Sequence, residues 1–390
     1  MKDFTFYGPT YFVFGKGKEQ ETGSYVKRFH GSKVLIHYGG GSAVKCGLIA
    51  RIEDSLKAEG ISYLELGNVK PNPRSGLIYE GIELCKKEGI DFILAVGGGS
   101  VIDSAKAIAA GALYDGDFWD FFEGTASIEK ALPIGTVITI AASGSEGSPD
   151  TVITYENGMY KRAADGEAIR PSFSILNPEL TLYLPDYQTA CGITDIMSHV
   201  LERYITNTKN VEITDRMCEG ILLAMITEGK RVMANPSDYE ARANIMWAAV
   251  VAHNDIVGVG RDQDWGTHHL EHELSSLYDC AHGAGLAVMF PAWMKYVYKH
   301  DLTPFLKLAT RVWGCQMNYE HPELTALEGI HAFENFLQSI GMPTSFAEIN
   351  GKEEDIPTLI ENLFYKRPNH GSFVQLTRES AAEIYRLACK

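Results

Sequence analysis

Along the first half of the chain, short apolar runs alternate with stretches in which apolar residues recur every three or four positions. The first pattern predicts buried strands and the second predicts amphipathic helices. The strand and helix pairs are residues 33–38 with 48–59, 61–66 with 75–88, and 92–96 with 101–110. Two further apolar runs, at 133–140 and 172–176, add strands. Because residues 92–96 (FILAV) are apolar throughout, as in a strand buried on both faces, we expect a mostly parallel sheet flanked by helices.

After Pro185 the pattern becomes helical and strand candidates nearly vanish. A last helix is expected to start behind Thr377 as its N-cap and to run toward Cys389. The other predicted helices cover residues 187–206, 213–233, 239–257, 286–299 and 302–312. A chain of 390 residues exceeds the size at which one core stops growing. We therefore place a boundary at 184–186 and predict an α/β domain at 1–185 and a helical domain at 186–390.

Composition and charge narrow the class of protein. The chain is 45% hydrophobic and 22% charged, which is ordinary for a globular protein. A formal charge of -15 argues against a nucleic-acid or anionic-membrane partner. No apolar run approaches the roughly 20 residues of a membrane span, and the N-terminal residues lack the basic-then-apolar plan of a signal peptide. Seven scattered cysteines without a CxxC pair fit reduced thiols, so we expect a cytoplasmic protein.

Two predicted strands end in consecutive glycines, at 39–41 and 97–99. Such a turn brings backbone N–H groups and the positive end of a helix to one point, which suits a phosphate. Ser100 and Asp103 also have the spacing of a capping box, which is a purely structural interpretation. Neither turn carries GxGxxG after the first strand, so the ordinary Rossmann fingerprint is absent. Residues 139–146 (TIAASGSE) follow another strand and by themselves predict only a loop.

The second half contains a constellation typical of a divalent-metal site. Asp195 and His199 are four apart on a predicted helix, hence on one face, and His268 and His272 have the same relation. Five of the twelve histidines fall between residues 253 and 282. Imidazole and carboxylate groups suit zinc or ferrous iron. The spacing alone does not decide which of these residues are ligands.

A further histidine and a rival motif belong to the same region. His282 lies shortly after Asp279, which we expect to be an N-cap, so His282 would sit in the first turn of the next helix. Residues 268–272 (HHLEH) also match the HxxEH pattern of metallopeptidases. That chemistry would leave Asp195, His199 and the glycine turns unexplained, so the hydrolase is a remote alternative.

The ordered motifs resemble those of the iron-containing alcohol dehydrogenases over nearly the whole chain. They are GGGSxxDxAK (97–106), SGSE (143–146), DxxxH (195–199) and DWGTHHLEHELSS…DCAHGAGLAVMFP (264–291). Within that family the chain is most similar to the butanol dehydrogenase and NADPH-dependent aldehyde reductase branch, through HYGGGSAVKCG and QDWGTHHLEHEL. The resemblance implies a dehydroquinate synthase-like architecture, with a dinucleotide-binding α/β domain, an all-α domain, a metal in the cleft between them, and a homodimer.

The resemblance also implies roles for individual residues. Asp195, His199, His268 and His282 would bind one Fe²⁺ or Zn²⁺ ion. His272 would be the catalytic residue near the substrate, and His269 a bystander. The implied cofactor contacts are Gly98, Gly99, Ser100 and Asp103 toward the pyrophosphate and nicotinamide, Thr139, Ser143 and Lys161 along the nicotinamide side, and Gly40, Gly41, Ser42, Pro71, Asn72 and Pro73 at the adenosine end.

The implied activity is hydride transfer between NADP(H) and a small primary alcohol or aldehyde such as butanol or butyraldehyde. NADP(H) is favoured over NAD(H) because residues 39–42 are Gly-Gly-Gly-Ser, with Lys45 nearby, where relatives that prefer NAD tend to carry an acidic residue. The chain departs from its relatives at residues 140–143 (Ile-Ala-Ala-Ser), which run into SGSE, and at Ser148, near the nicotinamide. A glycerol dehydrogenase-like polyol oxidoreductase and a dehydroquinate synthase-like lyase are the alternatives on the same scaffold.

Overall fold

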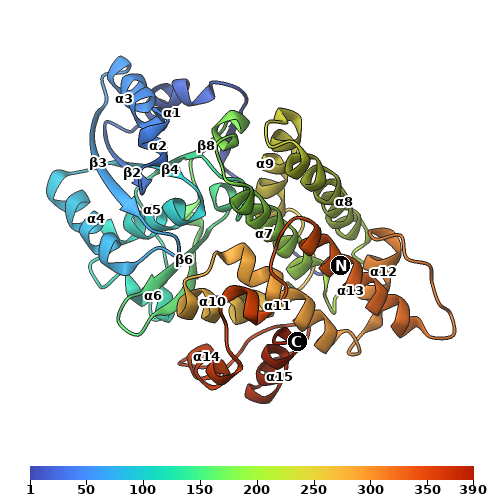
Figure 1. Ribbon diagram of the computed structural model, residues 1–390. Coiled ribbons are helices and arrows are strands. Elements are labelled where there is room, and N and C mark those ends of the chain that lie inside the picture. The colour runs from blue at the N-terminus through green and yellow to red at the C-terminus, as the bar shows by residue number, and fades with distance from the viewer. The chain divides into compact units, whose positions relative to one another are not determined.

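The computed structural model describes residues 1–390 and divides them into two compact units (Figure 1). One unit comprises Tyr7–Leu184, and the other comprises Pro185–Lys390 together with Met1–Phe6. The predicted first domain started at residue 1, but Met1–Phe6 belong to the helical unit. There the backbone N–H of Lys2 donates to the carbonyl of Gly260 (2.9 Å). None of the helices combines the length and the apolar character that crossing a membrane requires.

A six-stranded, fully parallel sheet forms the centre of the first unit, in the order β1-β8-β5-β4-β2-β3. Its strands are β1 (Tyr11–Phe14), β2 (Lys33–Gly39), β3 (Ser62–Val69), β4 (Phe92–Gly97), β5 (Ile134–Ile138) and β8 (Phe173–Leu176). The helices of this unit are α1 (Thr22–Arg28), α2 (Ser42–Lys45), α3 (Leu48–Ala58), α4 (Ser75–Glu88), α5 (Gly99–Ala112) and α6 (Trp119–Glu123).

The central strand β4 shows why the sheet is parallel and covered on both faces. All six of its residues are buried, as its unbroken apolar sequence predicts. Phe92, Leu94 and Val96 alternate along the strand and belong to one core cluster with Val34 and Ile36 of the neighbouring β2. The expected α/β class of this half is confirmed.

Strand order brings the two glycine turns next to each other. From β2 the chain moves to β3 on one side and then crosses to β4 on the other side of β2. The parallel strands β2 and β4 pair up to Tyr38 and Val96, so Gly39 and Gly97 end two adjacent strands at the same edge. A change of direction of this kind is where open α/β sheets bind their ligands, beyond the carboxyl ends of the strands.

One element of the first unit was not expected from the sequence. β6 (Asp150–Tyr155) and β7 (Tyr160–Asp165) form a separate antiparallel hairpin. Its turn places Gly158 and Met159 at positive φ. Asn157-Gly158, flanked by β-branched and aromatic residues, is a recognisable hairpin signal that could have identified this element.

The second unit is helical, as predicted. Its helices are α7 (Asp186–Tyr204), α8 (Glu212–Ala234), α9 (Tyr239–His253), α10 (Gly266–Tyr278), α11 (His282–Val297), α12 (Leu302–Arg311), α13 (Pro322–Ser339), α14 (Ile356–Leu363) and α15 (Arg378–Ala388). α13 and α14 were not among the expected helices, and α9 ends four residues earlier than expected. The N-cap prediction for Thr377 is confirmed, because its hydroxyl accepts from the backbone N–H of Ser380 (3.2 Å).

Candidate metal centre and cofactor turns

Helix α7 carries the first two predicted ligands in its buried middle. Every residue from 189 to 204 is buried, so the polar side chains of Asp195 and His199 need partners there. Nδ1 of His199 lies 2.9 Å from the backbone oxygen of Asp195, one turn earlier, and 3.0 Å from its Oδ1. These contacts fix the ring through Nδ1 and leave Nε2 available as a metal ligand.

The other two predicted ligands meet this pair. His268 lies on α10 and His282 is the first residue of α11. One potential ligand atom from each of Asp195, His268 and His282 lies within 4.8 Å of the other two. Nε2 of His282 is 3.8 Å from Oδ1 of Asp195, and the ring centroids of His199 and His268 are 4.7 Å apart. The structure thus brings together four side chains that the sequence separates by up to 87 positions (195 to 282).

Two atoms in this cluster indicate what it can bind. Nε2 of His268 is buried and makes no hydrogen bond, and the buried Oδ1 of Asp195 lies 3.0 Å from Nδ1 of His199. Burial disfavours the charged carboxylate, but His199 and His282 outweigh that effect and hold the pKa of Asp195 well below its usual range. Burial lowers the pKa of His268, which keeps its ring neutral. An anionic oxygen and imidazole nitrogens at one point form a donor set for a divalent cation.

Buried carboxylates lie behind two of the histidines. Oε1 of Glu202 is 2.8 Å from Nδ1 of His268 and also accepts from its backbone N–H (3.0 Å). Oε2 of Glu202 accepts from the backbone N–H of Trp265 (2.8 Å), and burial raises the pKa of Glu202 to about 7. A carboxylate of Glu271 contacts Nδ1 of His282 in the same way. Partners of this kind fix the ring orientation of ligating histidines and leave Nε2 for the ion.

A close approach of α11 to α7 places His282 near Asp195. A Cβ on Gly283 would lie 2.2 Å from the backbone oxygen of Cys191, so only glycine allows this contact. The expectation that Asp279 is the N-cap of this helix was wrong. Asp279 has a φ of 50° and ends α10 in the left-handed conformation, and Ala281 is the N-cap of α11.

In the α/β unit the glycine turn after β4 is packed against the loop after β5. A Cβ on Gly98 would lie 2.1 Å from Cγ2 of Ile140, and one on Gly99 would lie 2.4 Å from Oγ of Ser143. The backbone N–H of Thr139 donates to the carbonyl of Gly97 (3.1 Å). The predicted cofactor residues Gly98, Gly99, Thr139 and Ser143 therefore lie around one turn at the N-terminus of α5.

The capping-box interpretation of Ser100 and Asp103 was wrong. Gly98 is the N-cap of α5, and its carbonyl accepts from the N–H groups of Val101 (3.0 Å) and Ile102 (3.2 Å). The Asp103 carboxylate instead accepts from Oγ of Ser145 (2.6 Å) and from the backbone N–H of Val152 (3.0 Å). Asp103 thus joins α5 to the SGSE loop and to β6.

Buried Lys106, one turn later on α5, continues this support. Its ammonium group donates to the backbone carbonyls of Ser145 (2.7 Å), Ser148 (2.9 Å) and Asp150 (2.7 Å). Burial lowers the pKa of Lys106 to about 8 despite the charge of Asp103 nearby. The GGGSxxDxAK motif therefore supplies both a glycine turn at the N-terminus of α5 and the two side chains that hold the neighbouring loop.

The remaining predicted cofactor residues fall into two places. Gly40 and Gly41 follow β2 and face open space, and Ser42 begins the short helix α2. Nζ of Lys161, on β7, donates to Oδ1 of Asn72 (3.0 Å), and Pro71 and Pro73 flank that asparagine. Asn72 and Lys161, predicted for different ends of the cofactor, thus contact each other through their side chains.

Comparison with known proteins identifies the family of the chain. The model of the family described as iron-containing alcohol dehydrogenase matches residues 9–178, and the model of the C-terminal domain of the Fe-containing alcohol dehydrogenase family matches residues 189–389. The chain belongs to the iron-containing alcohol dehydrogenases. Membership in this family removes the metallopeptidase alternative and supports an oxidoreductase acting on alcohols or aldehydes.

Several iron-containing alcohol dehydrogenases resemble the chain over almost its full length. A probable NADH-dependent butanol dehydrogenase 2 of Bacillus subtilis is 42% identical over 96% of this chain and 95% of the relative. The NADPH-dependent aldehyde reductase YqhD of Escherichia coli is 36% identical over 93% of both chains. The crystal structure of NADH-dependent butanol dehydrogenase A of Thermotoga maritima has a TM-score of 0.97 and 43% identity, covering 100% of this chain and 99% of that one. Two of these similar proteins are named for NADH and one for NADPH.

Four further histidines of the helical unit contact candidate ligands or one another. His272 is buried, with its ring centroid 5.8 Å from that of His282, and is not part of the group that includes Asp195. His269, expected to be a bystander, is half-buried, and its Nδ1 lies 3.1 Å from Nδ1 of buried His370. His253 packs against His199, with ring centroids 4.2 Å apart.

The sequence analysis missed Arg203, which supports the end of α7. This fully buried side chain donates to the carbonyl of His199 (2.9 Å), contacts Nδ1 of His253 (3.1 Å) and lies 4.7 Å from the ring centroid of Trp265. An arginine four residues after His199, on the same face of an apolar helix, is the signal that could have identified it. Its backbone oxygen accepts from Nη1 of Arg261 (3.0 Å).

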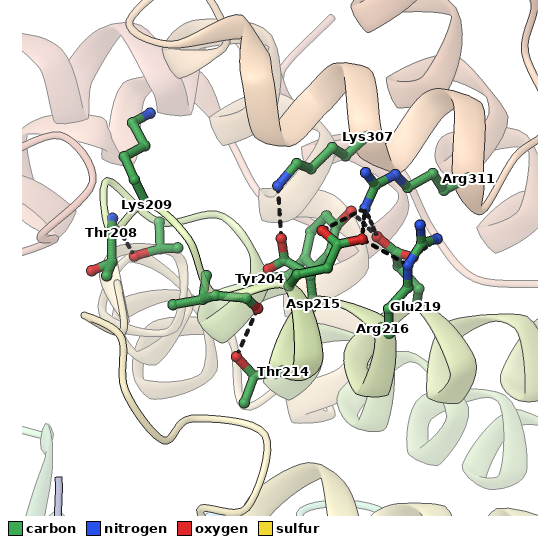
Figure 2. Close-up of polar contacts among 12 residues, drawn as sticks. Tyr204, Thr208, Lys209, Thr214, Asp215, Arg216, Glu219, Lys307 and Arg311 are labelled. Atoms are coloured by element: carbon green, nitrogen blue, oxygen red, sulfur yellow. Dashed lines mark hydrogen bonds and ion pairs between the residues drawn. The ribbon is translucent and has the colours of Figure 1, made fainter. Parts of the chain in front are cut away.

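A network of ion pairs and hydrogen bonds connects the C-terminal end of α7 to α8 and α12 (Figure 2). Lys307 donates to Asp215 (2.8 Å), and Arg311 lies against Glu219 (3.1 Å), which also accepts from the hydroxyl of Tyr204 (2.9 Å). Asp215 and Glu219 are 3% exposed, so each carboxylate depends on these partners. The network therefore fixes the C-terminal turn of α7, one turn beyond His199.

Proposed function

We propose that this protein is a metal-dependent alcohol dehydrogenase or aldehyde reductase that transfers hydride between NADP(H) and a small primary alcohol or aldehyde such as butanol or butyraldehyde. The observation that carries the proposal is the buried Nε2 of His268, which makes no hydrogen bond, in one cluster with the buried carboxylate of Asp195 and Nε2 of His282. The names of similar proteins, which are butanol dehydrogenases and an aldehyde reductase, support the substrate class.

We propose that Asp195, His199, His268 and His282 hold one Fe²⁺ or Zn²⁺ ion. Three imidazoles and one carboxylate, without a thiolate, are the donor set of a catalytic rather than a structural site. When bound, the ion would polarise the carbonyl oxygen of the substrate and stabilise the negative charge that develops there during hydride transfer. The chain's own part is to present four coordinating atoms from three helices, with each histidine fixed at Nδ1.

For the cofactor we propose that the N-terminus of α5, at Gly98, Gly99 and Ser100, binds the pyrophosphate. Helix α5 is 14 residues long, so its first N–H groups and its dipole favour an anion at this end. Thr139 and Ser143 lie beside the same turn and are proposed for the nicotinamide side. Asp103 is proposed to support cofactor binding indirectly, because its carboxylate holds Ser145 of the SGSE loop and Val152 of β6.

Preference for NADP(H) over NAD(H) is proposed from the turn after β2. Residues 39–45 contain no acidic side chain that would repel a 2′-phosphate, and Lys45 is exposed. The measurement is the ratio of kcat/KM for NADPH to kcat/KM for NADH with butyraldehyde. The expected ratio is above one and falls in Lys45→Glu. A ratio below one in the wild-type protein would contradict the preference and leave the hydride-transfer proposal intact.

His272 is proposed as the residue that relays a proton to the product oxygen. It is buried one turn from His268, in the group that also includes Glu271 and His282. Its substitution by alanine should lower turnover without preventing the protein from binding one equivalent of metal. Full turnover of His272→Ala across pH 6 to 9 would exclude the relay.

Assembly as a homodimer is also proposed. Strand β1 is an edge of the sheet that pairs only with β8, and Tyr11 and Phe14 on it are exposed. A molecular mass of twice 43.0 kDa in light scattering is the expected result, and a monomeric mass at assay concentrations would contradict it.

The proposed activity is tested by following nicotinamide absorbance with a panel of substrates. With Fe²⁺ or Zn²⁺ present, the wild-type protein should consume NADPH in a one-to-one ratio with butyraldehyde. Faster turnover of glycerol than of butanol in the oxidative direction would favour the polyol oxidoreductase. A reaction without net change in the nicotinamide would favour the lyase. His268→Ala should lose both metal binding and activity, because it removes an unpartnered coordinating atom.

A further inference from the structure

Glu271 is a buried carboxylate that the hydride-transfer chemistry leaves without a role. It lies on α10 between the metal-ligand candidate His268 and the helix end, and its side chain is fully buried. Oε2 contacts Nδ1 of His282, and Oε1 accepts from the hydroxyl of Ser275. In the sequence Glu271 supplies the glutamate of the HxxEH match, where a peptidase would need it as a base.

The orientation of His282 shows what this carboxylate does. Nδ1 of His282 contacts Glu271, and Nε2 lies 3.8 Å from Oδ1 of Asp195. Glu271 is therefore bound to the ring nitrogen that does not face the metal-ligand cluster, where it cannot activate a water on the ion. It accepts the Nδ1 proton and leaves the lone pair of Nε2 directed at the cluster.

His282 needs such support more than the other ligand candidates do. Its side chain is 25% exposed, whereas those of Asp195 and His268 are 6% exposed. It is also the first residue of α11, so no preceding helical turn packs against it. Without a partner at Nδ1, its imidazole would have freedom to rotate toward solvent.

The neighbouring helix leaves space for the carboxylate. Gly285 lies one turn along α11 from His282, and a Cβ there would be 2.5 Å from Oε1, 2.8 Å from Cγ and 3.0 Å from Cδ of Glu271. A side chain at position 285 would displace Glu271, because the carboxylate is buried and already bonded on both oxygens. The same helix thus carries His282 and the glycine that admits the partner of His282.

We propose that Glu271 is a positioning residue that fixes His282 for metal binding, and that Gly285 is required because it makes room for Glu271. This inference rests on the proposed metal site. A carboxylate behind a ligating histidine sets the tautomer and raises the basicity of the coordinating nitrogen, and its loss typically weakens metal binding 10- to 100-fold, by order of magnitude. The expected effect is therefore on the dissociation constant of the ion itself.

The test is a Zn²⁺ titration of metal-free protein in competition with a chromophoric chelator. Glu271→Ala should raise the Zn²⁺ dissociation constant by about 10- to 100-fold. Glu271→Gln should raise it less, because the amide oxygen can still accept the Nδ1 proton, and it decides the question if the alanine variant does not fold. Glu334→Gln is the matched control, since it removes a partly buried carboxylate that pairs with Lys295 on α11. Its dissociation constant should equal that of the wild type.

A double-mutant cycle tests the role of Gly285. Gly285→Ala should weaken Zn²⁺ binding by displacing Glu271, and the double variant Glu271→Ala/Gly285→Ala should bind no more weakly than Glu271→Ala alone. Additive losses would overturn the spatial argument, and dissociation constants within twofold of wild type for both Glu271 variants would overturn the proposal. Failure of the wild type to bind one equivalent, or normal binding by His268→Ala, would instead refute the metal site.

Discussion

Replacing Gly283 by alanine tests how α11 presents His282 to the metal-ligand cluster. The new Cβ would lie 2.2 Å from the backbone oxygen of Cys191 and 2.7 Å from its carbonyl carbon and Cα. Non-bonded heavy atoms rest at roughly 3.5–4.0 Å, so the two helices must separate by more than about 1 Å. These contacts are with backbone atoms, which a change of rotamer cannot relieve.

The displacement acts directly on the site. His282 precedes Gly283, and Asp195 follows Cys191 by one turn of α7, so separation of the helices lengthens the 3.8 Å distance between Nε2 of His282 and Oδ1 of Asp195. Overpacking of this kind costs about 1–3 kcal/mol of stability. A misplacement of about 1 Å at the reacting centre lowers kcat/KM by a factor on the order of 100.

The assay measures the urea unfolding of metal-free protein, the Zn²⁺ dissociation constant and kcat/KM for butyraldehyde in the same preparations. Gly220→Ala is the matched control, because Gly220 is an exposed glycine on α8 and nothing lies within 4 Å of its Cβ position. The control should be as active as wild type and more stable by up to about 1 kcal/mol. Wild-type metal affinity and kcat/KM in Gly283→Ala would refute the close-approach argument.

Two further predictions concern the α/β unit. His37 lies between the carbonyl of Leu66 and the hydroxyl of Ser104, and burial lowers its pKa from 6.5 to about 4. Between these two pH values the unfolded chain binds more protons than the folded chain, so the free energy of unfolding decreases as the pH falls. Urea unfolding should therefore show about 2 kcal/mol less stability at pH 5 than at pH 7. His37→Gln should flatten this dependence, and an unchanged slope in that variant would assign it to other groups. Lys106→Met should leave the three buried carbonyls that Lys106 binds without a donor and destabilise the unit by at least about 2 kcal/mol. Calorimetry and NADPH titration should show a lower Tm and weaker cofactor binding with an unchanged Zn²⁺ dissociation constant; equal losses of both affinities would contradict a role confined to the cofactor loop.

Local patterns were sufficient to predict the elements that carry both sites. The unbroken apolar run at 92–96 predicted a fully buried strand, and four-residue spacing predicted that Asp195 and His199 share a helix face. Strand order could not be predicted in the same way, because the pairing of β2 with β4 depends on contacts between segments about sixty residues apart.

The carboxylates that contact the candidate ligands were not predicted, because they too depend on contacts between segments far apart in the sequence. Glu202 and Glu271 look like ordinary charged helix residues in sequence, and only tertiary packing places them at Nδ1 of two histidines. Asp279 looked like an N-cap, but packing of α11 against α7 sets the helix start at His282. Ser100 and Asp103 looked like a capping box, but buried loop atoms compete for the Asp103 carboxylate.

We propose that one divalent ion, held by Asp195, His199, His268 and His282, is required for hydride transfer. The most direct measurement adds Zn²⁺ or Fe²⁺ stepwise to metal-free protein and records the initial rate of NADPH consumption with butyraldehyde. The rate should rise linearly and level off at one equivalent per chain, with no rise in His268→Ala. Full turnover by the metal-free protein, or no NADPH consumption at saturating metal, would contradict the proposal.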